Sequence, residues 1–184
     1  MKKVLIYLAP GFEEIEAVTI IDLLRRAEIE VIIAGLEEGY VIGSHGIRIM
    51  SDLYYEDIDP EEYDYLVLPG GQPGTNNLKK NLKVLELVKK FMQKNKLIGA
   101  ICAAPTVLWE AGILENKRIT SYPSEKMVFS SAVYEDSSVV KDGNLITSRG
   151  VGTAIDFALD LIGEIKGDSV KKETAEKILW KIKK

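Results

Sequence analysis

The 184-residue sequence has one cysteine, Cys102, and one histidine, His45. A single cysteine cannot form an intrachain disulfide, and this pair alone cannot supply the ligands of a structural zinc site. No apolar run approaches the roughly 20 residues needed to cross a bilayer. The apolar stretch near the N-terminus is too short for a signal peptide, because acidic residues follow it at once. We therefore expect a cytoplasmic protein with no membrane contact, no metal and no other cofactor.

The sequence also has fewer basic than acidic residues. It contains 24 Lys and Arg against 28 Asp and Glu, which gives a formal net charge of -4. An acidic chain gains little from phosphate contacts, so nucleic-acid binding is not expected. At roughly 100–200 residues per domain, the length predicts one domain. We expect it to span 1–184, with a core of about 2–166 and a C-terminal helix at about 169–183.

That C-terminal helix is predicted from a lysine-rich segment in which four apolar residues share one helical face: Ala175, Ile178, Leu179 and Ile182. Such a helix would dock on the domain with its lysines in solvent. Trp180 lies off this apolar face, and we expect it to contact a partner subunit.

Apolar runs of strand length alternate with amphipathic segments along the chain. Continuous apolar runs predict buried strands at 4–8, 30–35, 65–68 and 97–101. Helical periodicity predicts helices at 13–27, 82–95, 105–111 and 152–165. Turn residues between shorter apolar segments predict hairpins at 40–50 and 139–147. This order predicts an α/β fold with a mostly parallel sheet and helices on both of its faces.

Sites in such folds form beyond the carboxyl ends of the strands, which here are the turns at 9–16, 69–75, 102–105 and 147–152. Cys102 directly follows the strand at 97–101, and Pro105 suits the first turn of the next helix. This strand-to-helix turn is typical of a nucleophile elbow, and a helix N-terminus is expected to lower the thiol pKa. The alternative is a buried structural cysteine, which the turn position disfavours.

The other turns offer weaker signals. Gly70 and Gly71 allow backbone N–H groups to approach a ligand or oxyanion, although a simple tight turn explains them equally well. Three glutamates near the first helix start suit its dipole, and one pointing inward would meet the Cys102 turn. Such a glutamate, if protonated, could stabilise a thiolate. A glycine motif at 150–152 has Ile155 where a dinucleotide fingerprint needs a third glycine, which excludes NAD.

His45 lies in the first predicted hairpin, and we expect it at the surface rather than beside Cys102.

Taken together, the stretches 9–16, 22–27, 68–71, 100–105 and 141–150 resemble the ThiJ/PfpI superfamily, most closely its DJ-one (protein deglycase) branch. The resemblance covers about residues 2–166 and implies a flavodoxin-like three-layer sandwich and a homodimer. It implies that Cys102 is the nucleophile and Glu16 the neighbouring acid. It further implies an oxyanion site and pocket formed by Gly70, Gly71, Ala103, Tyr122, Arg26, Ser148 and Arg149, the last three at the pocket or the dimer contact.

Two departures from that family pattern bear on function. The branch often has a histidine in a Thr-His-Pro stretch, where this chain has Tyr122, which is no base at neutral pH. The protease-like branch has a histidine directly after its cysteine, where this chain has Ala103. Because a Cys–His pair is missing, peptide hydrolysis by this route is disfavoured.

These residues favour a cysteine-dependent stress-response enzyme of the glyoxalase or deglycase type, which works without glutathione. Its partner would be a small carbonyl substrate, such as methylglyoxal, or a protein modified by one. The alternative is a redox sensor or chaperone that works through oxidation of Cys102. A small-substrate amidase or intracellular protease ranks third. The first two hypotheses use the same residues, so the sequence leaves both open.

Overall fold

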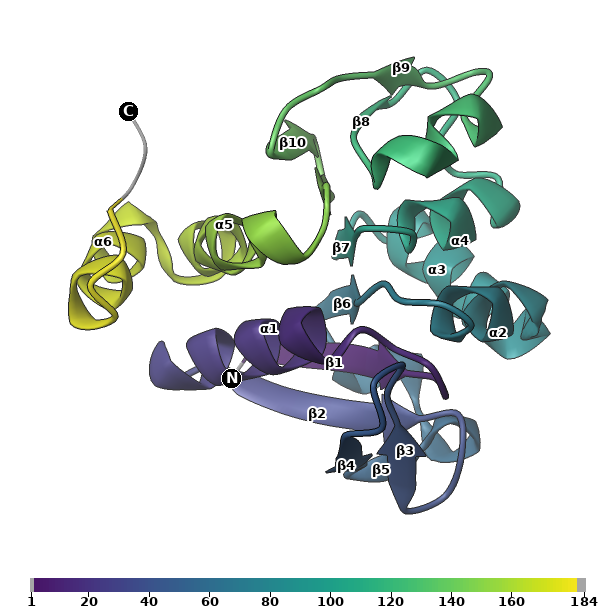
Figure 1. Cartoon of the computed structure of the whole chain (residues 1–184), viewed down its shortest axis with the longest axis horizontal. Coiled ribbons are helices and arrows are strands. Elements are labelled where there is room, and N and C mark those ends of the chain that lie inside the picture. Colours follow the sequence, from purple (N-terminus) through teal and green to yellow (C-terminus); the bar gives the residue numbers. More distant parts are fainter. Residues whose placement is uncertain (1, 182–184) are drawn as a thin grey trace.

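The computed structural model describes residues 2–181, which form a sheet flanked by helices (Figure 1). The sheet has seven strands in the order β10-β11-β7-β6-β1-β2-β5. Its strands are β1 (Lys3–Leu8), β2 (Glu30–Gly35), β5 (Leu53–Tyr54), β6 (Tyr65–Leu68), β7 (Leu97–Ile101), β10 (Val139–Asp142) and β11 (Leu145–Ser148). All neighbours pair in parallel except β10 and β11. The strands β2-β1-β6-β7-β11 follow the flavodoxin-like order.

Helices cover both faces of this sheet, which confirms the predicted layers (Figure 1). One face carries α1 (Glu14–Arg26), α5 (Ala154–Lys166) and α6 (Asp168–Lys177). The other carries α2 (Gly74–Lys80), α3 (Leu82–Gln93) and α4 (Pro105–Glu110). Short 3-10 helices lie at Tyr55–Asp57, Pro60–Glu62, Pro123–Val128 and Val151–Thr153. The helix predicted from residue 152 therefore begins as a 3-10 turn before α5.

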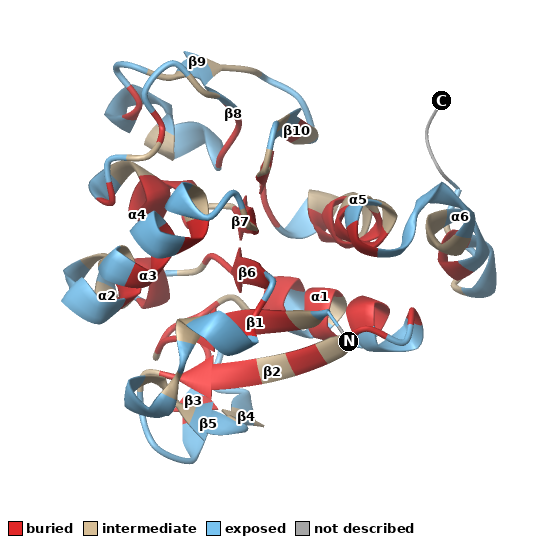
Figure 2. Cartoon of the chain, turned by 180° about the vertical axis from the view of Figure 1, so that it is seen from behind, coloured by how far each residue is buried: buried red, intermediate tan, exposed pale blue. Residues whose placement is uncertain are grey.

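The central strands are buried almost throughout because both faces are covered, as their unbroken apolar sequences predict (Figure 2). Gly99 in β7 allows α5 to approach closely, since a Cβ there would lie 3.0 Å from Phe157 Cζ. Both predicted hairpins are confirmed. One pairs β3 (Tyr40–Ile42) with β4 (Arg48–Met50), and the other pairs β10 with β11. A second two-stranded sheet pairs β8 (Arg118–Ile119) with β9 (Val133–Tyr134).

The C-terminal segment differs from the prediction. Helix α6 ends at Lys177, and Leu179 has a left-handed backbone (φ 58) and a side chain that is 90% exposed. The prediction of a helix that continues through Leu179, with this residue on the docked face, is therefore wrong. Ile182, also predicted on that face, lies outside the described residues. Trp180 donates from its ring nitrogen to Asp156 of α5 at 2.9 Å and packs on the core. These contacts lie within its own chain, and the expected contact of Trp180 with a partner subunit stays a prediction.

Within residues 2–181, no helix has the length and apolarity needed to span a membrane.

Candidate active site

A cleft of about 620 Å³ opens at the carboxyl edge of the sheet, where β7 and β11 end. This volume is in the range of small-molecule sites. The cleft is lined by Glu13, Glu16, Cys102, Tyr122, Pro123, Arg149, Gly150, Val151, Gly152 and Thr153. The lining thus combines the start of α1, the turn after β7 and the turn after β11.

Cys102 sits on a strained turn directly after β7. Its φ of 64° is in the left-handed region, which non-glycine residues adopt only where the surroundings impose it. Here the N–H of Cys102 donates to Ser148 O at 2.9 Å, and its carbonyl accepts from Tyr122 N at 2.8 Å. These two bonds fix the turn, so that the partly exposed thiol projects into the cleft as in a nucleophile elbow.

Glu16, in the first turn of α1, is fully buried beside that thiol. Its Oε2 accepts from Gly70 N at 2.9 Å, whereas Oε1 has no hydrogen-bond partner within residues 2–181. A Cβ built on Gly150 would lie 3.8 Å from both Glu16 Oε1 and Cys102 Sγ, so these atoms border the same small space. A Cβ on Gly70 would lie 2.6 Å from Cys102 Cβ and 2.8 Å from Glu16 Oε2. Only glycine therefore fits between the two side chains.

The acid and the thiol shift each other's ionisation. Burial raises the pKa of Glu16 to about 7, although the Gly70 N–H and the Cys102 thiol oppose the shift. Burial, and then the charge of Glu16, raise the pKa of Cys102 to about 12. The expectation that the helix start lowers this thiol pKa is wrong, because burial and the charge of Glu16 outweigh the local N–H groups.

The pair therefore carries at most one negative charge near neutral pH. If Glu16 holds the proton, the repulsion disappears and the thiol can be the ionised group. Because the two arrangements have the same total charge, a thiolate beside a neutral acid is accessible without any change of pH.

Two backbone N–H groups point at the sulfur, from Gly71 and Ala103, and both favour its ionised form. Within the described chain neither donates to a backbone carbonyl. They are placed to hold negative charge that develops on an atom bonded to the sulfur. The N–H of Gly70 is instead used by Glu16, so this residue positions the acid rather than an oxyanion.

Tyr122 and Arg149 both line the cleft. The tyrosine is 50% exposed at its mouth, and Arg149 Nη1 donates to Asp136 Oδ1 at 2.7 Å. Ser148 is buried beneath the lining, where its hydroxyl donates to Ser138 O at 2.8 Å. It supports the turn after β11 and does not line the cleft.

Arg26, which the resemblance placed at the pocket or the dimer contact, also lies outside the cleft lining. It lies at the far end of α1 from Glu16, and its Nε donates to Asp22 Oδ2 at 2.5 Å. There it lines a second cleft with Ile155 and Ile178. At about 1.5 Å per helical residue, ten residues put it roughly 15 Å along the helix from Glu16.

The sequence model of the DJ-1/PfpI family matches residues 2–164. The chain belongs to the DJ-1/PfpI family. It is 42% identical to Protein dj-1beta of Drosophila melanogaster over 181 residues, which cover 97% of each chain. The crystal structure of that protein superposes with a TM-score of 0.95, covering 98% of this chain and 99% of the other.

Two other relatives extend the comparison. An archaeal protein of Pyrococcus abyssi, named a deglycase, is 37% identical over 152 residues, covering 82% of this chain and 91% of its own. The structure of oxidized DJ-1 from Toxoplasma gondii has a TM-score of 0.95 at 34% identity, covering 99% of this chain and 100% of that one. These relatives confirm the flavodoxin-like fold and mark the chain as a DJ-1-type protein.

In this DJ-1/PfpI chain, sequence reasoning missed Pro123 and Thr153 as cleft residues. Thr153 Oγ1 accepts from the N–H of Gly150 at 3.1 Å and is 2.6 Å from the Ser148 hydroxyl. It therefore fixes the turn that faces the thiol. The sequence signal for Thr153 was its position shortly after a strand, at the carboxyl edge of the sheet where ligand sites form in α/β folds.

His45 is exposed, as predicted, and it does not line the cleft that contains Cys102. Its Nδ1 is 2.9 Å from Glu14 Oε2, and this contact raises the pKa of His45. Burial would raise the pKa of Glu14, but the hydrogen bonds from His45, Ser44 and backbone N–H groups outweigh it and bring that pKa down to about 2. Since His45 is the sole histidine, the cleft has no Cys–His pair.

Proposed function

We propose that this DJ-1/PfpI protein is a stress-response enzyme that converts reactive dicarbonyl compounds, or their adducts on proteins, without glutathione. The observation that carries the proposal is the placement of the Cys102 thiol beside a fully buried Glu16 whose Oε1 is unpaired within residues 2–181. The archaeal relative named a deglycase supports the same class of activity. A lone cysteine without a disulfide suits a reducing compartment, and we place the protein in the cytoplasm.

The first step is attack of the Cys102 thiolate on the aldehyde carbon of methylglyoxal, which forms a C–S bond. The N–H groups of Gly71 and Ala103 hold the resulting oxyanion. Protonated Glu16 then gives its proton to that oxygen, which yields a hemithioacetal and leaves Glu16 as a carboxylate.

Glu16 next works as a base. It removes the proton from the carbon bonded to sulfur and delivers a proton to the former ketone carbon, so that an enediol becomes a thioester of lactate. Water hydrolyses the thioester, which releases lactate and regenerates the thiol. No electrons leave or enter the substrate overall, because oxidation at one carbon balances reduction at its neighbour.

The test is lactate formation from methylglyoxal, without glutathione, by the wild type, Cys102→Ser and Glu16→Gln. Loss of the nucleophile or of the acid–base group should lower turnover by about 100-fold or more. Glu37→Gln removes an exposed carboxylate outside the cleft and should retain full turnover. Undiminished lactate formation by Cys102→Ser would rule the mechanism out.

The second candidate is redox sensing through Cys102. The Toxoplasma gondii relative is an oxidized DJ-1, which favours oxidation chemistry in a protein of closely similar structure. With peroxide as oxidant, the thiol would pass through sulfenic to sulfinic acid. Intact mass after peroxide titration separates the candidates. Arrest at two added oxygens in the wild type, with none in Cys102→Ser, supports sensing, and unselective oxidation opposes it.

We also propose that the chain forms a homodimer through the exposed side of α1. Ile15 and Val18 of α1 and Ile47 of the β3–β4 hairpin are exposed apolar side chains. Exposed apolar groups of this kind mark interaction surfaces when they lie together. Light scattering should give twice the chain mass, and Val18→Asp should shift the protein towards monomer. A monomeric wild type at micromolar concentration would refute the proposal.

A further inference from the structure

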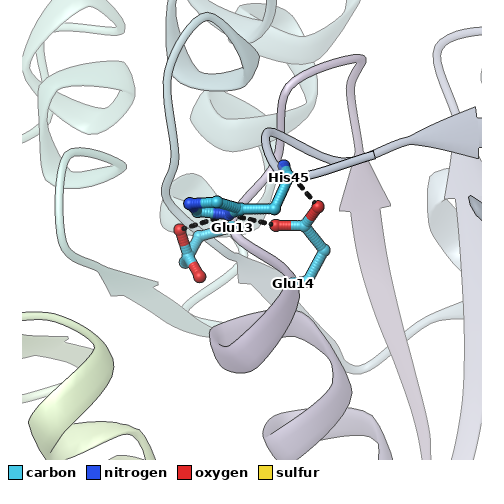
Figure 3. A group of neighbouring side chains, drawn as sticks. All are labelled: Glu13, Glu14 and His45. Atoms are coloured by element: carbon cyan, nitrogen blue, oxygen red, sulfur yellow. Dashed lines mark hydrogen bonds and ion pairs between the residues drawn. The ribbon is translucent and has the colours of Figure 1, made fainter. Parts of the chain in front are cut away.

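A group of potential metal-ligand atoms lies where α1 begins (Figure 3), and it shares Glu13 with the cleft lining but does not include Cys102. It combines Glu13 and Glu14, where α1 begins, with His45, which is 31 residues from Glu14 in the β3–β4 hairpin. His45 Nδ1 is 2.9 Å from Glu14 Oε2 and 3.8 Å from Glu13 Oε2. One ligand atom from each of the three residues falls within 4.8 Å of the others.

The hydroxyl of Ser44 completes a four-cornered cage. Its Oγ lies 3.0 Å from His45 Nδ1, 3.1 Å from Glu14 Oε2 and 3.5 Å from Glu13 Oε2. A tetrahedral ion with bonds of about 2.0–2.2 Å holds its ligand atoms roughly 3.3–3.6 Å apart. Five of the six separations among these atoms, from 2.9 to 3.8 Å, bracket this value, and the Glu13 and Glu14 ligand atoms lie within 4.8 Å of each other. The cage is therefore close in size to a tetrahedral coordination site before any ion enters it.

The surrounding backbone holds the cage in shape. The N–H of His45 donates to Glu14 Oε1, which turns Oε2 towards the imidazole. The N–H of Ser44 donates to Phe12 O at 2.8 Å, which ties the hairpin to the segment before α1. A Cβ on Gly43 would lie 2.3 Å from Glu14 Oε1, so glycine leaves room for the carboxylate. Contacts that orient a ligand in this way are what the residues behind the ligands supply at metal sites.

We propose that Glu13, Glu14 and His45 bind a divalent transition-metal ion of the Zn²⁺ type, with Ser44 or a water as the fourth ligand. Two carboxylates balance the 2+ charge, and Glu14 is only 3% exposed, so its charge gains from a cation close by. An imidazole ligand suits Zn²⁺, whereas Mg²⁺ prefers oxygen ligands and retains its waters.

Binding would join the hairpin to the start of α1 and fix Glu13, which also lines the reaction cleft. The ion would thus stabilise one wall of the cleft without touching the thiol, and its binding does not depend on the proposed enzyme activity. An ion that binds only the folded chain raises the melting temperature by mass action.

The test uses the metal-free full chain carrying Cys102→Ser, so that the thiol cannot bind the ion. Titration with Zn²⁺ against a chromogenic chelator should show one ion per chain and a rise in Tm. Co²⁺ should give the intense visible absorption of a tetrahedral site. Adding His45→Asn keeps an amide that can donate to Glu14 but removes the imidazole, and Zn²⁺ affinity should fall at least tenfold.

Glu13→Gln is a second variant, because a glutamine oxygen can still accept the capping bond from Ile15 N. It should also weaken Zn²⁺ binding at least tenfold, while the exposed Glu38→Gln should not. The proposal is overturned if the parent binds no Zn²⁺, if His45→Asn and Glu13→Gln bind it as tightly as the parent, or if Mg²⁺ binds as well as Zn²⁺.

Discussion

Glu16 Oε2 accepts a 2.9 Å hydrogen bond from the N–H of Gly70, and this bond leaves the other carboxyl oxygen on the side of Cys102. A single backbone donor thus orients a fully buried acid that comes from a different element than the nucleophile. Gly70, in the turn after β6, lies between the two side chains. Because it has no Cβ, it leaves room for both of them to stay close together. The segments after β1, β6 and β7 thus supply the acid, the glycine and the nucleophile of one reaction centre.

The first expectation concerns the pH at which the thiol becomes nucleophilic. With the pKa of Glu16 raised to about 7, the pair loses its first proton near that pH. Thiolate beside protonated Glu16 is one of the two forms of that singly charged pair, so it is populated only once the first proton has left. The rate of Cys102 alkylation by iodoacetamide should therefore rise with pH, with an apparent pKa of about 7, and then level off.

In Glu16→Gln the thiol titrates alone, so the step near pH 7 should disappear. Intact mass against time at each pH gives the alkylation rates, and a small-molecule thiol supplies the reference curve. A wild-type rate that climbs steadily through pH 9 would show that the thiol ionises independently of Glu16.

The second expectation concerns stability. Folding raises the pKa of Glu16 from 4.5 to about 7, so the folded chain binds an extra proton between these values. This group therefore favours folding fully below pH 4.5, and its contribution is lost as pH rises through 7. An amide at this position escapes that loss, so Glu16→Gln should be more stable than the wild type at pH 8 by about 1–3 kcal/mol.

Urea unfolding at pH 5 and pH 8 measures this difference, and the gap between the two proteins should narrow at the lower pH. Glu37→Gln, a substitution of an exposed acid, is the matched control. Its free energy of unfolding should differ from that of the wild type by the same amount at both pH values. Equal stability of Glu16→Gln and wild type at pH 8 would contradict the raised pKa.

The third expectation concerns the glycine between acid and nucleophile. Gly70→Ala would place a methyl group 2.6 Å from Cys102 Cβ and 2.8 Å from Glu16 Oε2, and both distances are shorter than non-bonded contacts of a Cβ atom. The two side chains must separate, so methylglyoxal turnover should fall at least tenfold. Gly152→Ala is the control within the same cleft, because nothing lies within 4 Å of its added Cβ. If both variants turn over equally, the spacing between Cys102 and Glu16 does not limit the reaction.

The strands were predictable from sequence because burial on both sides requires unbroken apolar runs, as at Leu97–Ile101. The position of Cys102 followed from the same pattern, since the turn after a buried strand is visible in the sequence. Helix α2 was not predicted, because Gly74–Lys80 contains little helical periodicity and Leu78 is its one large buried apolar side chain. The last turn at Leu179 depends on the left-handed backbone there, which no apolar pattern reveals.

The different roles of Glu14 and Glu16 also could not be read from sequence. Both are buried in the first turn of α1, yet the pKa of Glu14 falls to about 2 while that of Glu16 rises to about 7. Glu14 gains His45, Ser44 and backbone N–H groups from a hairpin distant in sequence, whereas Glu16 receives one backbone N–H. Such partners appear only once the hairpin is placed against α1.

The final expectation concerns Tyr122, which lines the cleft at the position where the family resemblance led us to expect a histidine. Its Cδ2 lies 3.5 Å from the position of a Cβ on Gly150, the point that is also 3.8 Å from Cys102 Sγ. A phenol does not exchange protons readily at neutral pH, whereas an imidazole does. Tyr122→Phe should therefore leave methylglyoxal turnover within about twofold, because the hydroxyl takes no part in proton transfer.

Tyr122→His should raise methylglyoxal turnover about tenfold or more, because an imidazole can carry the proton in a rate-limiting proton transfer. Cys102 alkylation in both variants reports whether the thiol itself has changed. A large loss in Tyr122→Phe with unchanged alkylation would show that the tyrosine hydroxyl itself contributes to turnover.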